Sequence, residues 1–125
     1  MNILISTSSK VPLFIQIKEQ IKQQVYQGEL KEGDALPSMR VLAKQLKVSV
    51  ITTKRAYEDL EMEGFLISSV GKGTFVRGQQ PHVLKEWKIR ELETELENVV
   101  LEAKRIGLTK NELIERLDIF YEGDG

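Results

Sequence analysis

The chain has 125 residues, of which 41% are hydrophobic and 30% charged, with one histidine, no cysteine and a net charge of −1. This composition is typical of one compact domain plus an appendage, and it excludes disulfide bonds and thiolate metal sites. No segment approaches the roughly 20 apolar residues of a membrane-spanning helix, and the N-terminus lacks the features of a secretory signal, so we expect a cytoplasmic protein without a membrane partner.

The small net charge hides an uneven distribution. Residues 1–80 carry a net charge of +3, whereas residues 81–125 carry −4. Within the first part, residues 35–57 hold five basic side chains and no acidic one. Such a segment indicates a surface that contacts phosphate groups, and the simpler alternative is a solvated basic face.

The N-terminal region predicts a helix that begins at Pro12 and ends at Gly28. Proline suits the first turn of a helix because its missing N–H would be unpaired there, and glycine suits the left-handed residue after a helix. Apolar residues recur between them at helical spacing, at Phe14, Ile17, Ile21 and Val25. We expect this face to pack into the core.

Two further helices follow at short spacing. Pro37 disfavours helix before it, and Ser38 is a good N-cap, so a second helix is predicted up to Leu46. After a tight break, Ser49 caps a third helix that ends at Gly64. The buried face of this third helix is predicted to hold Thr53, Ala56, Tyr57 and Leu60. Two short helices joined by a turn form the helix-turn-helix pattern.

The hydrophobic period then changes from helix to strand. Residues 65–69 and 74–77 are typical of strands, and the four residues Val70-Gly71-Lys72-Gly73 suit a hairpin turn that needs positive φ angles. Three helices followed by a hairpin form a winged helix. Residues 1–77 are therefore predicted to be a winged helix-turn-helix DNA-binding domain.

The C-terminal part is predicted to be helical. Residues 78–82 form a short polar linker, and residues 83–125 a helical dimerisation domain. Gly107 separates two helices there, and Thr109 and Glu112 form a capping box that opens the second one. The predicted fold class is mainly α (α+β), with an N-terminal winged helix and a C-terminal two-helix unit.

Apolar residues of this C-terminal part are the candidate dimerisation residues. Six of them alternate at spacings of three and four, as in the seam of a coiled coil. The seam could pack against a second subunit or against the last helix of its own chain. The seam residues and their counterparts in the last helix are Ile89, Leu92, Leu96, Val99, Ala103, Ile106, Leu113, Leu117 and Phe120.

Several segments of the winged-helix region form a recognisable series. They are Pro12-Leu13-Phe14-Ile15-Gln16-Ile17, Gly28-Glu29-Leu30, Gly33-Asp34-Ala35-Leu36-Pro37-Ser38-Met39-Arg40-Val41-Leu42-Ala43, Val48-Ser49 through Ala56, Leu60-Glu61-Met62-Glu63-Gly64 and Gly71-Lys72-Gly73-Thr74-Phe75-Val76. In this order and spacing they resemble the winged-helix domain of GntR-type bacterial transcription regulators. The short helical tail resembles the YtrA-type branch of that family.

The resemblance implies a homodimeric, sequence-specific DNA-binding regulator, more typically a repressor, that binds an inverted-repeat operator in double-stranded DNA. The YtrA-type branch further implies control of transporter or membrane-stress genes. Two departures from the family pattern stand out. Met39 replaces the usual glutamate, and Val50 replaces an arginine found in many members. Arginine would recognise guanine, so Val50 shifts operator preference, and an apolar residue there could touch a thymine methyl instead.

The candidate DNA-binding residues lie at the starts of the second and third helices and at the hairpin tip. Simpler interpretations exist. The two serines could cap their helices only, and Arg40 could be an ordinary surface arginine. Ile51 could pack against the second helix, and the hairpin tip could be an ordinary turn. The predicted contacts are Ser38, Arg40, Ser49, Val50, Ile51, Thr52, Lys54, Gly71 and Lys72.

Enzymatic function is not expected. The one histidine, His82, lies in the polar linker without a nucleophile partner, and no glycine-rich phosphate loop occurs. We therefore predict no catalytic residue, no metal site and no cofactor, and the sequence requires no small-molecule effector. The main alternative is a protein-docking module, and the acid-free segment 35–57 argues against it.

Overall fold

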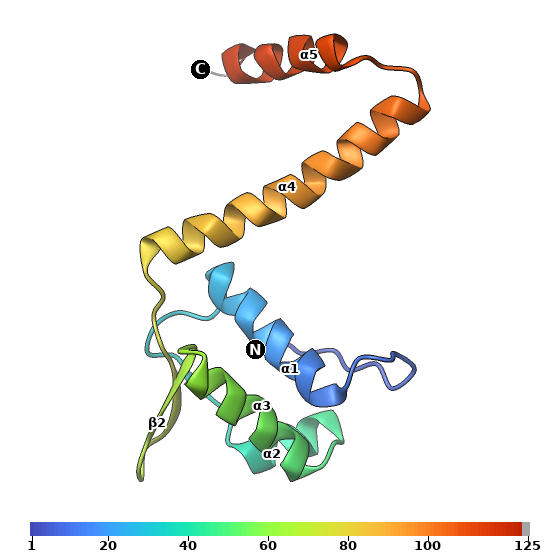
Figure 1. Cartoon of the computed structure of the whole chain (residues 1–125). Helices are drawn as coiled ribbons and strands as arrows, with labels where there is room; N and C mark the ends of the chain where they lie inside the picture. Colours follow the sequence, from blue (N-terminus) through green and yellow to red (C-terminus); the bar gives the residue numbers. More distant parts are fainter. Residues whose placement is uncertain (124–125) are drawn as a thin grey trace. The chain divides into compact units, whose positions relative to one another are not determined.

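The computed structural model describes residues 1–123, which contain five α-helices and one three-stranded antiparallel sheet (Figure 1). The chain divides into two units, the first covering Met1–Leu84 and the second beginning at Lys85. The predicted fold class, a winged helix followed by two helices, is confirmed. Within the described range, no helix is both long and apolar enough to cross a bilayer.

The first unit contains three helices and the sheet. The helices pack around a core whose largest fully buried side chains are Ile17, Ile21, Tyr57, Leu60, Leu66 and Val76. The predicted buried faces of the first and third helices are thereby confirmed, with Phe14 only half-buried. The elements are α1 (Leu13–Tyr26), β1 (Ala35–Leu36), α2 (Met39–Leu46), α3 (Val50–Met62), β2 (Leu66–Ser69) and β3 (Gly73–Val76).

Helices α1 and α3 run side by side in the same direction. Near their starts, the Arg55 guanidinium lies 3.8 Å from the centre of the Phe14 ring. Towards their ends, the Lys18 ammonium lies 3.0 Å from the Glu63 carboxylate, and Lys22 pairs with the same carboxylate. Burial raises the pKa of Glu63, but the hydrogen bonds from Lys22 and Lys18 outweigh it and hold the pKa below its ordinary value.

Three glutamines of α1 hold the N-terminal arm in place. Their side chains bond to the backbone of alternate arm residues at 2.6–2.9 Å, Gln24 to Asn2, Gln20 to Leu4 and Gln16 to Ser6. Two residues of extended chain advance about 6.6 Å and four residues of helix about 6 Å, so the two spacings match. Ile3 lies between the bonded residues and is buried. The sequence pattern did not predict this arm, which adds Ile3 to the core.

The sheet has one strand more than the predicted hairpin. Its order is β1-β3-β2, with β3 paired antiparallel to both neighbours. In β1, Leu36 is buried and pairs with Thr74 of β3. The pairing ties the segment that enters α2 to the strand that leaves the hairpin tip.

The second unit consists of α4 (Pro81–Arg105), from Lys85 onward, and α5 (Lys110–Gly123). Helix α4 begins inside the segment predicted as a linker. Gly107, with φ +76°, follows its C-terminus, as predicted. The predicted capping box is also confirmed, because the Glu112 N–H donates to Thr109 Oγ1 at 3.2 Å and the Thr109 N–H donates to Glu112 Oε1 at 3.0 Å.

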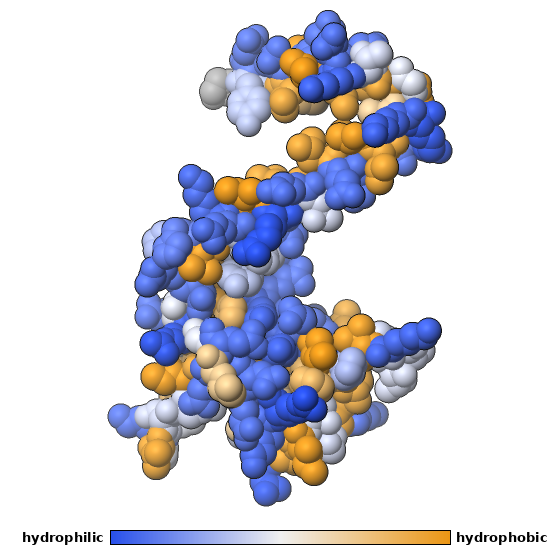
Figure 2. Space-filling model, viewed as in Figure 1, coloured by the Kyte–Doolittle hydropathy of each residue, from blue (hydrophilic) through white to orange (hydrophobic). Residues whose placement is uncertain are grey.

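The apolar seam of α4 is largely uncovered within the chain itself. Of its six residues Ala103 is buried, and the other five are 43–71% exposed. Figure 2 shows hydrophobic side chains at the surface of both C-terminal helices. In α5, Leu113 is half-buried, whereas Leu117 and Phe120 are exposed. The last helix therefore leaves most of the seam of its own chain uncovered.

Candidate nucleic-acid interface

The start of α2 is fixed by two hydroxyl groups of α3. The Tyr57 hydroxyl donates to the Pro37 carbonyl at 2.7 Å, and Thr53 Oγ1 donates to the Met39 carbonyl at 2.9 Å. Ser38 caps the helix, with its Oγ accepting from the Val41 N–H at 3.2 Å, which confirms the predicted N-cap. These bonds, together with the β1–β3 pairing, hold α2 against both α3 and the hairpin.

An open groove of about 550 Å³ lies between the start of α2 and the hairpin. It brings together three of the predicted contact residues, Ser38, Arg40 and Lys72. The two cations have no ion-pair partner among residues 1–123. The groove therefore combines a helix N-terminus with two free positive charges, which suits a phosphate group. Its lining is completed by Leu36, Met39, Gly73 and Thr74.

The first turn of α3 holds four more predicted residues. Ser49 is the N-cap, and its Oγ accepts from the Thr52 N–H at 3.2 Å, as predicted. Val50 and Thr52 are half-buried, and Ile51 is 79% exposed. The alternative in which Ile51 packs against the second helix is therefore wrong.

The two basic residues of α3 have different surroundings. The Lys54 ammonium lies 3.8 Å from a carboxylate oxygen of Glu58, one turn further along an exposed face. The Arg55 guanidinium instead lies over the Phe14 ring of α1. Both residues are exposed, but only Arg55 contacts another helix, through the Phe14 ring.

The hairpin tip has the turn chemistry predicted for it. Gly71 and Gly73 have φ angles of +76° and +115°, which side chains other than glycine rarely adopt. The Lys72 N–H donates to the Ser69 carbonyl at 3.0 Å and closes the turn. Val70 is fully exposed beside them. The tip therefore presents backbone, one cation and one apolar side chain to solvent.

Thr53 and Tyr57 position the start of α2, whereas sequence reasoning placed them only in the core. Both are buried, but their hydroxyl groups reach out of the core to the backbone before and within α2. Burial raises the pKa of the Tyr57 hydroxyl, which therefore stays a neutral donor. The sequence signal for these hydrogen bonds is the presence of two hydroxyl side chains, a threonine and a tyrosine, on the otherwise apolar face of α3.

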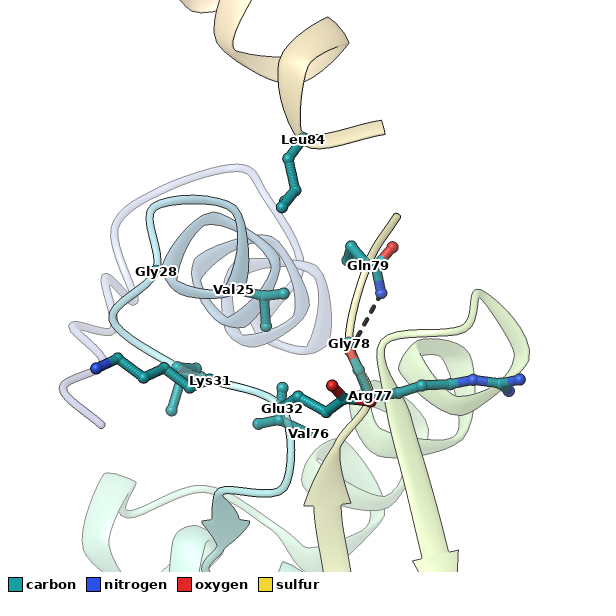
Figure 3. Close-up of a pocket in the computed structure, with 10 residues that line it drawn as sticks. Val25, Gly28, Lys31, Glu32, Val76, Arg77, Gly78, Gln79 and Leu84 are labelled. Carbon is teal, nitrogen blue, oxygen red and sulfur yellow. Dashed lines mark hydrogen bonds between the residues drawn. The ribbon is translucent and has the colours of Figure 1, made fainter. Parts of the chain in front are cut away.

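A second cavity, of about 250 Å³, lies where β3 leaves the sheet (Figure 3). Its lining includes Val25, Leu30, Glu32 and Leu84, and none of the predicted contact residues. The Glu32 carboxylate lies so close to Gly78 that a Cβ there would be 2.8 Å from its Cδ. Among residues 1–123, including this cavity, no group of three or more acidic, histidine or cysteine side chains could hold a metal.

Residues 14–76 match the sequence profile described as "Bacterial regulatory proteins, gntR family". The chain belongs to the GntR family. It is 32% identical to the HTH-type transcriptional repressor YtrA of Bacillus subtilis, over 90% of this chain and 87% of that protein. The family assignment, including its YtrA-type character, is thereby confirmed.

Solved structures support the fold, and some of them contain operator DNA. YtrA from Sulfolobus acidocaldarius, a GntR-family transcription factor, is 30% identical, with a TM-score of 0.56 over 98% of both chains. The DNA-binding domain of AraR in complex with operator ORX1 is 32% identical, with a TM-score of 0.53 over 61% of this chain and 95% of that one. This GntR chain is thus a DNA-binding transcriptional regulator and not an enzyme.

Proposed function

We propose that this GntR regulator is a repressor that binds an inverted-repeat operator as a homodimer. The observation that supports the dimer most directly is the exposed apolar seam of α4. Burying each of Leu92, Leu96 and Val99 fully would contribute roughly 1.5–3 kcal/mol. A second copy of the chain, with the same seam, is the occupant that this pattern favours.

The corner between α4 and α5 offers a further part of the same surface. A shallow apolar depression of about 360 Å³ lies there, lined mostly by aliphatic side chains. It is continuous with the seam, because Val99, Ala103 and Ile106 belong to both. Leu113 lines it from α5, and the exposed Leu117 and Phe120 follow along that helix. These residues would extend the interface beyond α4.

The DNA contacts follow from the groove and from α3. Arg40 and Lys72 would bind phosphate or base edges from the groove, with the N-terminus of α2 at Ser38. The first turn of α3, from Ser49 to Thr52, would enter the major groove, and Lys54 would contact the backbone beside it. Gly71 at the hairpin tip allows the wing to approach the minor groove closely.

A symmetric dimer implies two inverted half-sites, and occupation of such a site near a promoter would exclude polymerase. The similar Bacillus subtilis protein is named a repressor, which supports this direction of regulation. By resemblance to YtrA-type regulators, transporter or membrane-stress genes are the proposed targets. The protein would act in the cytoplasm, where bacterial DNA lies.

Selection of operators from random duplex DNA tests this proposal. We expect the wild-type chain to enrich an inverted repeat whose half-sites are separated by about one helical turn. If no sequence is enriched and binding to random duplexes does not weaken with salt, the chain does not act through DNA. A protein-docking role would then be the better account of its surfaces.

A further inference from the structure

The first turn of α3 presents an apolar surface where a DNA-binding helix meets the bases. Ile51 is 79% exposed and Val50 is half-buried beside it. No side chain of the described residues covers Ile51. An aliphatic side chain of this size gains free energy when apolar surface replaces water around it. Its exposure at this position therefore favours an apolar partner.

The polar groups around this turn already have partners. The hydroxyl groups of Ser49 and Thr52 lie 2.9 Å apart and bond to each other. The Lys54 ammonium faces Glu58 at 3.8 Å, and the Arg55 guanidinium lies over the Phe14 ring. The one guanidinium near the start of α3 is therefore held against α1, and the exposed Lys54 offers only a single ammonium, not the bidentate donor pair with which arginine recognises guanine.

The major groove offers one apolar group on its base edges, the C5-methyl of thymine. We propose that α3 recognises thymine, or another 5-methylated pyrimidine, through contacts of Ile51 and Val50 with this methyl group. The inference rests on the proposed DNA-binding function and names the chemistry of its target. It predicts at least one thymine at a fixed position of each half-site.

Replacing thymine by deoxyuridine tests the proposal, because this change removes the C5-methyl and leaves the hydrogen-bonding edge intact. Duplexes of the selected operator are made with deoxyuridine at one thymine of each half-site in turn, and affinities are measured with the full chain. At the position that faces Ile51 we expect about fourfold weaker binding per half-site, the loss that corresponds to one buried methyl group. Other thymines should show no loss.

Variants of the same helix assign the effect to Ile51. In Ile51→Ala, binding to the thymine operator should weaken, and the penalty for deoxyuridine at that position should disappear. In Met62→Ala, which removes another highly exposed apolar side chain at the far end of α3, both the affinity and the deoxyuridine penalty should stay as in the wild type. Because both residues are exposed, neither substitution should change the unfolding midpoint.

The outcomes separate this inference from the function on which it rests. An inverted repeat could be selected and bound tightly while deoxyuridine has no effect at any position. The proposed thymine-methyl contact would then be wrong, and the proposed operator-binding function would still hold. A penalty that persists unchanged in Ile51→Ala would also overturn the methyl contact. If no operator is enriched at all, both the inference and the proposed function fail.

Discussion

Two basic residues of the candidate interface, Arg40 and Lys54, differ in the groups that lie near their charges. Arg40 lies in the first turn of α2, lines the groove and has no ion-pair partner within residues 1–123. Lys54 lies one turn into α3, and its ammonium lies 3.8 Å from a carboxylate oxygen of Glu58. A free guanidinium at a helix start can bond bidentately to a base, whereas an exposed ammonium acts as a single positive charge and suits a phosphate contact. Replacing each residue by alanine should therefore change DNA binding in a different way.

Titration of the operator at several salt concentrations distinguishes them. Arg40→Ala should cost about 1–3 kcal/mol and relax preference at one position of each half-site. Lys54→Ala should weaken binding to all sequences alike and lower the salt slope by about one unit. Lys104→Ala, which removes an exposed cation of α4, is the matched control and should change neither. Identical profiles for the first two variants would contradict these roles.

Tyr57 connects the core to the interface through one hydroxyl group. Tyr57→Phe keeps the buried ring and removes the donor to the Pro37 carbonyl, so we expect the free energy of unfolding to fall by about 1–2 kcal/mol. Operator affinity should also fall under conditions where the variant is fully folded, because the start of α2 loses its anchor. Tyr121→Phe, at an exposed position of α5, should leave both unchanged. If Tyr57→Phe had the stability and operator affinity of the wild type, the hydrogen bond to Pro37 would not position the start of α2.

At the scale of elements, the contacts between α1 and α3 couple stability to pH. The carboxylate of Glu63 bonds to Lys18 and Lys22, and its pKa in the fold lies below the ordinary value of 4.5. A carboxyl group with a lowered pKa adds stability above its unfolded pKa and loses that stability as the pH falls through the folded value. The α1–α3 pair should therefore loosen on acidification below about pH 4.5.

Chemical denaturation at pH 7 and at several values below 4.5 tests this coupling. Glu63→Gln should be less stable than the wild type at pH 7, and the difference should shrink as the pH falls. Glu93→Gln removes an exposed carboxylate of α4 and keeps the α1–α3 contacts, so its curve should follow the wild type. A difference between Glu63→Gln and the wild type that is constant with pH would mean that these ion pairs are not responsible.

The helices could be predicted because each carries its own local signals. Apolar spacing, the caps at Ser38 and Ser49, and the glycines at 28, 64 and 107 are properties of adjacent residues, and the structure places them as expected. The capping box at Thr109 and Glu112 is local in the same way. The candidate contact residues followed from these helix starts and from the family resemblance.

Other elements depend on contacts between distant segments and have no local signal. Strand β1 is two residues long, too short for an alternating pattern, and it exists because Leu36 pairs with Thr74. The three glutamines of α1 have the composition of a solvated helix face, yet their amides bond to residues near the N-terminus. The groove at Arg40 and Lys72 likewise required the pairing of β1 with β3.

At the scale of the whole molecule, the account requires α4 to join two copies of the chain. Leu96 belongs to the seam and is 58% exposed, and Leu101, equally exposed on the same helix, lies outside it. Leu96→Glu should therefore give monomers in sedimentation experiments while the winged-helix unit stays folded. Leu101→Glu, the matched control, should remain dimeric. A dimer that persists in Leu96→Glu would place the interface elsewhere.

The central claim, a dimer on two inverted half-sites, is tested most directly by comparing two duplexes that differ in one half-site. Binding of the full chain to the selected operator and to the same duplex with one half-site scrambled is measured together with the mass of each complex. We predict two chains per intact operator and, because each mismatched base pair costs about 1–3 kcal/mol, at least about hundredfold weaker binding to the scrambled duplex. One chain per operator with equal affinity for both duplexes would contradict the account.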